Sequence, residues 1–491
     1  MCTTHSDFLT RPGSPTRRAP TQTVSTWLAH CVCPANPSGK FDEYNQDEIP
    51  FAAGAHEARV SGFSNAPGAS HIRWWIVGLL FASTVINYID RQTLSVLAPY
   101  LKKDYHWNNQ DFALVVIAFR LAYTIGQAVC GRLIDRLGTR RGLTISVTFY
   151  SLVAMATSLA TGLRSFAGLR FLLGIGESAN WPGATKAVSE WFPRRERAMA
   201  VAIFDSGSSI GAAVAPALVI GIYSAFGGWQ PVFLITGALG FLWLWVWRRF
   251  YYPPETHPSI NAGERDALLQ DRAEASEGTP IVARARWVDL LKYRQTWGAI
   301  ASRALTDPVW YFIADWFALY LVARGFSLAH SLLAFWVPFL AADLGNYTGG
   351  AVSTWLVHRG WPVGRARKAI VIPGAFGVLC LIPAAYATGL PLISLFFGIA
   401  TFSYAAFSTM ANTFPADLFT TDAVASVSGM GGAASGMGTI LSTYAVGYIA
   451  DHLGFRPALV GASVIPVIAM LVVLALVRNT SSSGRGIVLK I

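Results

Sequence analysis

Residues 74–98 read WWIVGLLFASTVINYIDRQTLSVLA, an apolar stretch in which an acid and a base, Asp90 and Arg91, stand side by side. The stretch is long enough for a helix that crosses about 30 Å of hydrocarbon. A charged side chain at the centre of such a helix costs about 2.5–3.5 kcal/mol on insertion scales. Both groups must therefore face a protein interior or a watery cavity, which predicts a functional site at membrane depth.

The composition of the chain indicates a protein with many membrane spans. Of its 491 residues, 53% are hydrophobic and only 13% are charged, whereas ordinary soluble domains contain about 25% charged residues. The net charge of +11 comes from basic residues in short loops, and the basic stripe of a nucleic-acid-binding protein is absent. We therefore predict an all-α polytopic membrane protein that does not bind nucleic acid.

Twelve apolar spans of about 20 residues follow one another along the chain. Arginines cluster in the loops after the second, fourth and eighth spans, so the even-numbered loops and both termini are expected to be cytoplasmic. The predicted spans are 74–98, 111–133, 143–162, 166–189, 198–224, 230–250, 296–323, 329–356, 368–387, 390–413, 424–449 and 456–478.

The spans form two related sets of six. Glycines, an aromatic residue and a proline recur without gaps between 221–231, at the end of the fifth span, and 447–457, at the end of the eleventh. Parallel repeats of this kind build one class of secondary transporter. The predicted parts are a disordered tail (1–70), an N-terminal six-helix half (71–250), a cytoplasmic linker (251–295), a C-terminal six-helix half (296–478) and a cytoplasmic C-terminal tail (479–491).

The loop between the second and third spans carries the sequence GRLIDRLGTRR at 131–141. Small residues permit close helix contact and tight turns, while the arginines hold the loop in the cytoplasm. The pattern resembles the loop signature of the major facilitator superfamily, in which the matching aspartate closes a gate between the halves. The resemblance implies gating roles here, and a simple topology anchor is the alternative; the residues concerned are Gly131, Asp135, Arg136, Gly138 and Arg140.

The fourth span holds a second pair of charges at membrane depth, Arg170 and Glu177. Seven residues apart, they share one helix face with Gly174 between them. A carboxyl group at this depth is a candidate proton carrier, and the arginine is a candidate anion ligand, because transporters use such groups in ion relays. A purely structural pair is the alternative.

Three stretches, 87–91, 170–182 and 189–197, together make residues 72–478 similar to the anion:cation symporter family of facilitators. Further motifs at 206–211, 303–310 and 339–345 resemble the bacterial hexuronate transporters within it. The resemblance implies that Asp90 and Glu177 bind the coupling protons. It also implies a substrate site in which Arg91 grips the carboxylate. Arg170 is the candidate anion ligand named above. The further candidates are Tyr123, Gln127, Ser208, Arg303, Trp310 and Asn412, and ordinary helix packing is the alternative for the last five of them.

We therefore predict a proton-coupled importer of a small organic anion, a hexuronate or related sugar acid, in the bacterial inner membrane. Its expected partners are the anion, protons and the lipid bilayer, and it is expected to act as a monomer. The sequence contains no recognisable enzyme motif, cofactor site or metal-ligand spacing. An exporter of drugs or metabolites and a transporter-like sensor are the alternatives, and Arg120, an additional cation in the second span, leaves the exact anion open.

Overall fold

The protein is described here by a computed structural model that covers residues 71–276, 286–326 and 332–477. These residues form helices joined by short connections, and no strand occurs among them. The prediction of an all-helical polytopic protein is confirmed. The two predicted tails, 1–70 and 479–491, lie outside the described residues, and the predicted domain boundaries stay predictions.

The N-terminal half supplies the first six predicted spans in order. Its helices are α2 (Ile72–Asp104), α3 (Asn109–Leu137), α4 (Thr139–Ala156), α5 (Leu163–Glu177), α6 (Asn180–Trp191), α7 (Arg197–Phe226) and α8 (Gln230–Phe250). The fourth span is divided between α5 and α6. Pro182 cannot donate to the carbonyl of Ser178 and its ring clashes there, so the helix breaks immediately after Glu177.

A connecting segment leads to the C-terminal half. The segment contains η2 (Pro254–Thr256), α9 (Ala262–Ser276) and α10 (Trp287–Leu290). The second half consists of α11 (Arg294–Ala323), α12 (Leu332–His358), α13 (Val363–Gly377), α14 (Leu381–Tyr386), α15 (Leu390–Leu418), α16 (Val424–Leu453) and α17 (Phe455–Leu476), and the ninth predicted span is shared by α13 and α14. Eight helical stretches of the described chain are long and apolar enough to cross a membrane.

Helix α3 has two faces of opposite character. Leu114, Ile117, Leu121 and Ile125 recur at helical spacing on one face, and each is exposed, as expected for side chains that meet lipid. The opposite face turns Tyr123 and other residues toward the interior cavity. A membrane helix thus buries its polar stripe and exposes its apolar one, the reverse of a helix on a soluble protein.

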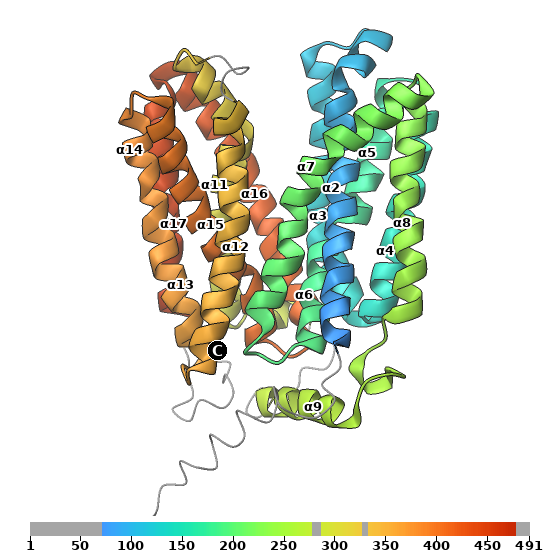
Figure 1. The fold of residues 1–491 in the computed structure, drawn as a ribbon, viewed down its shortest axis with the longest axis vertical. Coiled ribbons are helices and arrows are strands. Elements are labelled where there is room, and N and C mark those ends of the chain that lie inside the picture. The colour runs from blue at the N-terminus through green and yellow to red at the C-terminus, as the bar shows by residue number, and fades with distance from the viewer. Residues whose placement is uncertain (1–70, 277–285, 327–331, 478–491) are drawn as a thin grey trace, which may run out of the picture. The chain divides into compact units, whose positions relative to one another are not determined.

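The two halves lie side by side and approach each other toward the end of the bundle where α9 lies, as Figure 1 shows. Helices α3 and α16 meet there through small residues. A methyl group added to Gly131 would clash with the carbonyl oxygen of Ala425, and one added to Gly429 would clash with that of Gln127. Because only hydrogen fits at these positions, the glycines permit the close contact between the halves.

We expect Gly429→Ala to lower the stability of the purified protein by about 1–3 kcal/mol, because the added methyl group meets a rigid backbone carbonyl. Gly78→Ala is the matched control, since Gly78 also lies in a helix and has no atom within 4 Å of the added group. Thermal unfolding in detergent provides the measurement. Equal unfolding midpoints for the two variants would show that the α3–α16 contact is not as tight as described.

Candidate functional site

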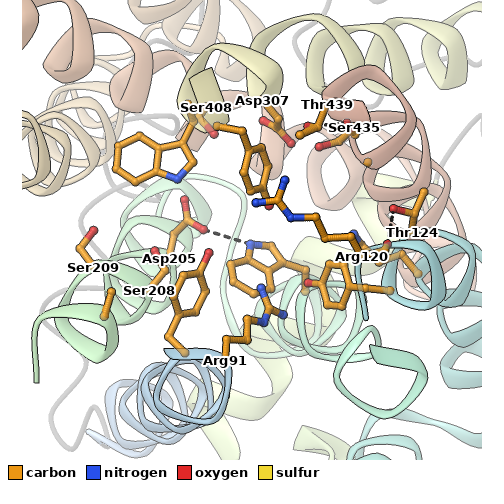
Figure 2. Close-up of a pocket in the computed structure, with 18 of the residues that line it drawn as sticks. Arg91, Arg120, Thr124, Asp205, Ser208, Ser209, Asp307, Ser408, Ser435 and Thr439 are labelled. Carbon is orange, nitrogen blue, oxygen red and sulfur yellow. Dashed lines mark hydrogen bonds between the residues drawn. The ribbon is translucent and has the colours of Figure 1, made fainter. Parts of the chain in front are cut away.

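A cavity of about 340 Å³ lies between the two halves, and Figure 2 shows side chains from several helices converging on it. The volume lies at the lower end of the range for small-molecule sites, about 300–1,000 Å³. Its wall combines aromatic rings with hydroxyl, amide and charged groups. Such a lining suits a small polar ligand that is contacted on several sides.

Arg91 on α2 is held in place at the cavity wall by several contacts. Its Nε donates to Glu177 Oε2 at 2.7 Å, and its Nη2 donates to Asn87 Oδ1, also at 2.7 Å. The Tyr123 and Tyr88 rings lie 4.3 and 5.0 Å from the guanidinium carbon. The guanidinium is thus fixed in position by two hydrogen bonds and by aromatic faces that attract a cation.

Asp90 lies behind the cavity wall rather than on it. Its side chain is buried, and the Thr236 hydroxyl lies beside its carboxylate without forming a hydrogen bond of good geometry. Arg170, which lines the cavity, donates from Nη1 to the backbone carbonyl of Asp90 at 3.3 Å. The ion pair around this point joins Glu177 to Arg91, on another helix, and not to Arg170. Asp90 and Arg91, adjacent in the sequence, therefore each contact a charged residue of α5 and not each other.

The C-terminal half contributes a second ion pair to the cavity. Arg303 Nη2 lies 3.1 Å from Asp307 Oδ2, one turn along α11. The other oxygen of Asp307 accepts from the Tyr404 hydroxyl at 3.4 Å. The Tyr404 ring in turn stacks on Trp310, with the ring centres 6.0 Å apart. This wall is therefore a neutralised pair with an aromatic surface beside it.

The structure brings the predicted substrate ligands together. All eight line the cavity: Arg91, Arg170, Tyr123, Gln127, Ser208, Arg303, Trp310 and Asn412. Of the two predicted proton carriers, Glu177 reaches the cavity through Arg91 and Asp90 lies behind it. Arg120 also lines the cavity, with its guanidinium 5.9 Å from the Tyr311 ring. Their roles in binding and proton transfer stay predictions.

Sequence reasoning missed Asp205, which lines the cavity from α7. The signal was present, because Asp205 is an acid inside the apolar span 198–224, the same criterion that singled out Asp90. Trp181 and Tyr311 were missed as well. An aromatic residue in a membrane helix is too common to be singled out by its position in the sequence.

At the α9 end of the bundle, Asp135 joins the halves. Its Oδ2 accepts from the backbone N–H of Ser426 at 2.7 Å, and its Oδ1 lies 3.0 Å from Lys186 Nζ. Ser426 belongs to the first turn of α16, where unpaired N–H groups attract an anion. Asp135 therefore contacts both halves, and its gating role stays a prediction.

The other loop residues predicted to act in gating occupy different positions. Gly138 ends α3 with a φ of 78°, which favours glycine. Arg140 donates from Nη2 to the carbonyl of Arg248 at 2.7 Å and lies 3.7 Å from the centre of the Tyr252 ring. Arg136 is exposed. Arg140 therefore contacts the same half, and Asp135 and Gly131 are the loop residues that contact the opposite one.

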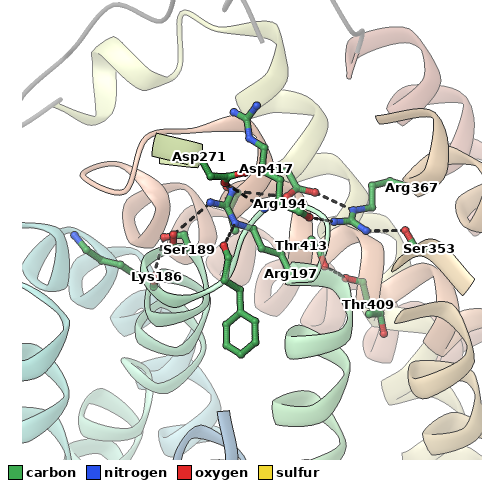
Figure 3. A network of polar contacts seen from close by, with 12 residues as sticks. Lys186, Ser189, Arg194, Arg197, Asp271, Ser353, Arg367, Thr409, Thr413 and Asp417 are labelled. Carbon is green, nitrogen blue, oxygen red and sulfur yellow. Dashed lines mark hydrogen bonds and ion pairs between the residues drawn. The ribbon is translucent and has the colours of Figure 1, made fainter. Parts of the chain in front are cut away.

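A second polar network joins the halves at the same end, around Asp417 of α15 (Figure 3). Arg367 Nε donates to Asp417 Oδ2 at 2.9 Å, and Arg197 Nη1 lies 3.8 Å from Oδ1. Arg367 also donates to the carbonyl of Arg194, which belongs to the N-terminal half. All three charged side chains are buried.

The connecting helix α9 contacts this region too. Asp271 Oδ2 accepts from the backbone N–H of Arg194 at 3.4 Å, and Arg272 donates to the carbonyl of Glu190. The connecting segment thus lies against the ends of α6 and α7 (Figure 1). In the described residues, no group of three or more His, Cys, Asp or Glu side chains is placed to hold a metal ion.

Comparison with known proteins identifies similar chains. The family model described as Major Facilitator Superfamily matches residues 80–431. The Hexuronate transporter of Escherichia coli (strain K12) is 32% identical over 416 residues, which cover 83% of this chain and 94% of the relative. The D-galactonate transporter of Escherichia coli O6:H1 is 30% identical over 86% of this chain and 99% of the relative.

Solved structures have the same fold at lower sequence identity. The proton:xylose symporter XylE bound to 6-bromo-6-deoxy-D-glucose has a TM-score of 0.68 at 14% identity, over 86% of this chain and 98% of that one. A structure of the Escherichia coli fucose:proton symporter FucP has a TM-score of 0.60 at 18% identity, over 82% and 98% of the two chains. The predicted facilitator fold is confirmed.

We expect Asp417→Asn to destabilise the protein by about 3–5 kcal/mol, because it leaves the buried Arg367 and Arg197 without their counter-charge. Asp289→Asn is the control, since Asp289 pairs with Arg286 and Lys292 on the surface and should leave the unfolding midpoint unchanged. Thermal unfolding of both purified variants measures the difference. Similar midpoints would mean that the Asp417 network does not hold this end of the bundle together.

Proposed function

We propose that this chain, a transporter that belongs to the major facilitator superfamily, imports a small sugar acid together with protons. The relatives named as hexuronate and galactonate transporters support the substrate class. The two proton symporters of like fold support the coupling ion. The proposed substrate is a hexuronate or a closely related acid, and the proposed location is the bacterial inner membrane with both termini in the cytoplasm.

The ion pair between Arg91 and Glu177 is the observation that carries the proposal. A guanidinium holds a carboxylate through two parallel hydrogen bonds, and Arg91 is fixed at the cavity wall where a substrate carboxylate can reach it. Glu177 occupies the Nε of this guanidinium at 2.7 Å. A substrate carboxylate and an ionised Glu177 compete for one cation, so substrate binds best when Glu177 has taken up a proton.

Asp90, which lies behind the cavity wall, is a second candidate for proton binding. A buried carboxylate with at most a neutral hydroxyl beside it is costly when ionised, so Asp90 is suited to hold a proton. It contacts Arg170 through its backbone and not through its carboxylate. We propose that Asp90 and Glu177 take up protons from the outside and release them inside, while Arg91 holds the anion.

The contacts at the α9 end provide the gate in this proposal. Asp135 binds the first turn of α16, and Asp417 binds Arg197 and Arg367. Both sets join the halves on the side that the arginine-rich loops assign to the cytoplasm. Inward release requires these contacts to separate while others form at the opposite end, as in rocking of two repeats about a central site.

We expect Glu177→Gln to abolish uphill uptake driven by a pH gradient and to preserve exchange of substrate across the membrane. The amide is a permanent mimic of the protonated acid, so Arg91 stays available for the anion while no proton is carried. Proteoliposomes with an acidic exterior and labelled galacturonate measure both activities. Glu255→Gln, outside the predicted membrane-spanning helices, is the matched control and should accumulate substrate normally.

Uphill accumulation by Glu177→Gln would contradict the proton assignment. Movement of galacturonate out of the vesicles against the inward proton flow would instead identify an exporter. In that case the direction of transport is wrong and the role of Arg91 is untouched.

We expect Arg91→Lys to weaken galacturonate binding by about tenfold or more. Lysine keeps the charge but loses the planar fork that contacts Glu177 and Asn87 together. Isothermal titration with purified protein measures the affinity, and circular dichroism checks that the helices are intact. An unchanged affinity would show that the substrate carboxylate does not bind at Arg91.

A further inference from the structure

We propose that Asp205 selects acids that carry hydroxyl groups, by accepting hydrogen bonds from those hydroxyls beside the arginine that holds the carboxylate. This inference rests on the proposed function and specifies its substrate class. Asp205 lies on α7 and lines the cavity, and Figure 2 shows it pointing toward the rings of the cavity wall.

The position of Asp205 is set by a tryptophan. The Trp181 Nε1 donates to Asp205 Oδ1 at 3.0 Å. The Trp181 ring also lies 5.9 Å from the Arg91 guanidinium and contacts the Tyr88 ring, with the ring centres 6.0 Å apart. One aromatic side chain therefore holds a hydrogen-bond acceptor and approaches the anion ligand. A ligand that binds Arg91 presents its remaining groups close to Asp205.

Asp205 differs in charge environment from the other carboxylate on the wall. Asp307 is neutralised by Arg303 at 3.1 Å. Within the described residues, no ion pair joins Asp205 to a cation, and its hydrogen bond to Trp181 comes from a neutral donor. An ionised carboxylate without a cationic partner repels an anionic ligand. This repulsion lowers the affinity for every acid that cannot donate a hydrogen bond to the carboxylate.

An acid that carries hydroxyl groups can compensate for this repulsion with hydrogen bonds. Each sugar hydroxyl can donate to a carboxylate, and such charge-assisted hydrogen bonds are about twice as strong as neutral ones. The neighbouring Ser208 already donates its hydrogen to the Asp205 backbone carbonyl at 2.7 Å, so its oxygen is left to accept. Two acceptors side by side favour a ligand rich in donors. An acid without hydroxyls is repelled and leaves both acceptors unpaired.

The test compares two acids on purified protein by isothermal titration. Galacturonate carries hydroxyls on a six-membered ring, and tetrahydropyran-2-carboxylate has the same ring and carboxylate without them. The Asp205→Asn variant keeps an oxygen for Trp181 and removes the charge. We expect it to bind galacturonate about tenfold to a hundredfold more weakly and the unhydroxylated acid at least as tightly as the wild-type protein does.

Asp343→Asn is the matched control for charge acting at a distance. Asp343 on α12 is a carboxylate that is not among the cavity-lining residues. Its removal should change the affinities for both acids in the same direction and leave their ratio within about twofold. A second variant, Asp205→Ser, also keeps an acceptor for Trp181 and should reproduce the loss of preference.

The outcomes distinguish a failure of the role proposed for Asp205 from a failure of the proposed transport function. If wild-type protein prefers galacturonate and Asp205→Asn keeps that preference, the role of Asp205 is overturned and the transport proposal stands. If wild-type protein binds neither acid, the proposed function fails and the inference fails with it. If no Asp205 variant folds, singly deoxygenated galacturonates on the wild-type protein decide, since equal affinity for all of them overturns the inference.

Discussion

The ion pair between Arg91 and Glu177, 2.7 Å long and at membrane depth, is the interaction on which the central site depends. An unpaired charge in this place costs several kcal/mol, so each member is tolerable only because of the other. The pair joins α2 to the last residue of α5, immediately before the break that Pro182 imposes. The helix break and the long-range ion pair therefore occur at the same residue, Glu177.

The same constraint organises the α9 end of the bundle. There the charges of Asp135, Asp417 and Arg367 are buried between the halves and are satisfied by partners on both sides. Buried pairs of this kind contribute little net stability, but leaving one partner alone is costly. The network therefore favours two arrangements, joined or fully separated, over intermediate ones. Such a two-state interface is what a rocking transporter requires.

Much of the fold was predictable because its physics is local. Twelve apolar spans and the position of Asp135 at the end of the second span follow from hydropathy, loop charge and one motif. The pairing of charges was not predictable. Arg91 stands next to Asp90 in the sequence but contacts Glu177, since neighbours on a helix point in different directions and partners are chosen by packing. Asp205 was missed although the rule that found Asp90 applied to it.

In the proposed function, the charges of the cavity provide both the anion selectivity and the proton coupling. Four arginines line it, against two carboxylates, Asp205 and Asp307. Glu177 and Asp90 lie next to the arginines of the N-terminal half. When both acids are ionised, they neutralise the two positive charges that Asp205 and Asp307 leave unbalanced. Protonation of these two acids leaves an excess of two positive charges, of which a monocarboxylate neutralises one, and a bound anion favours protonation to the same degree. In the proposed mechanism this reciprocal attraction disfavours half-loaded states, and symport also requires that such states do not reorient across the membrane.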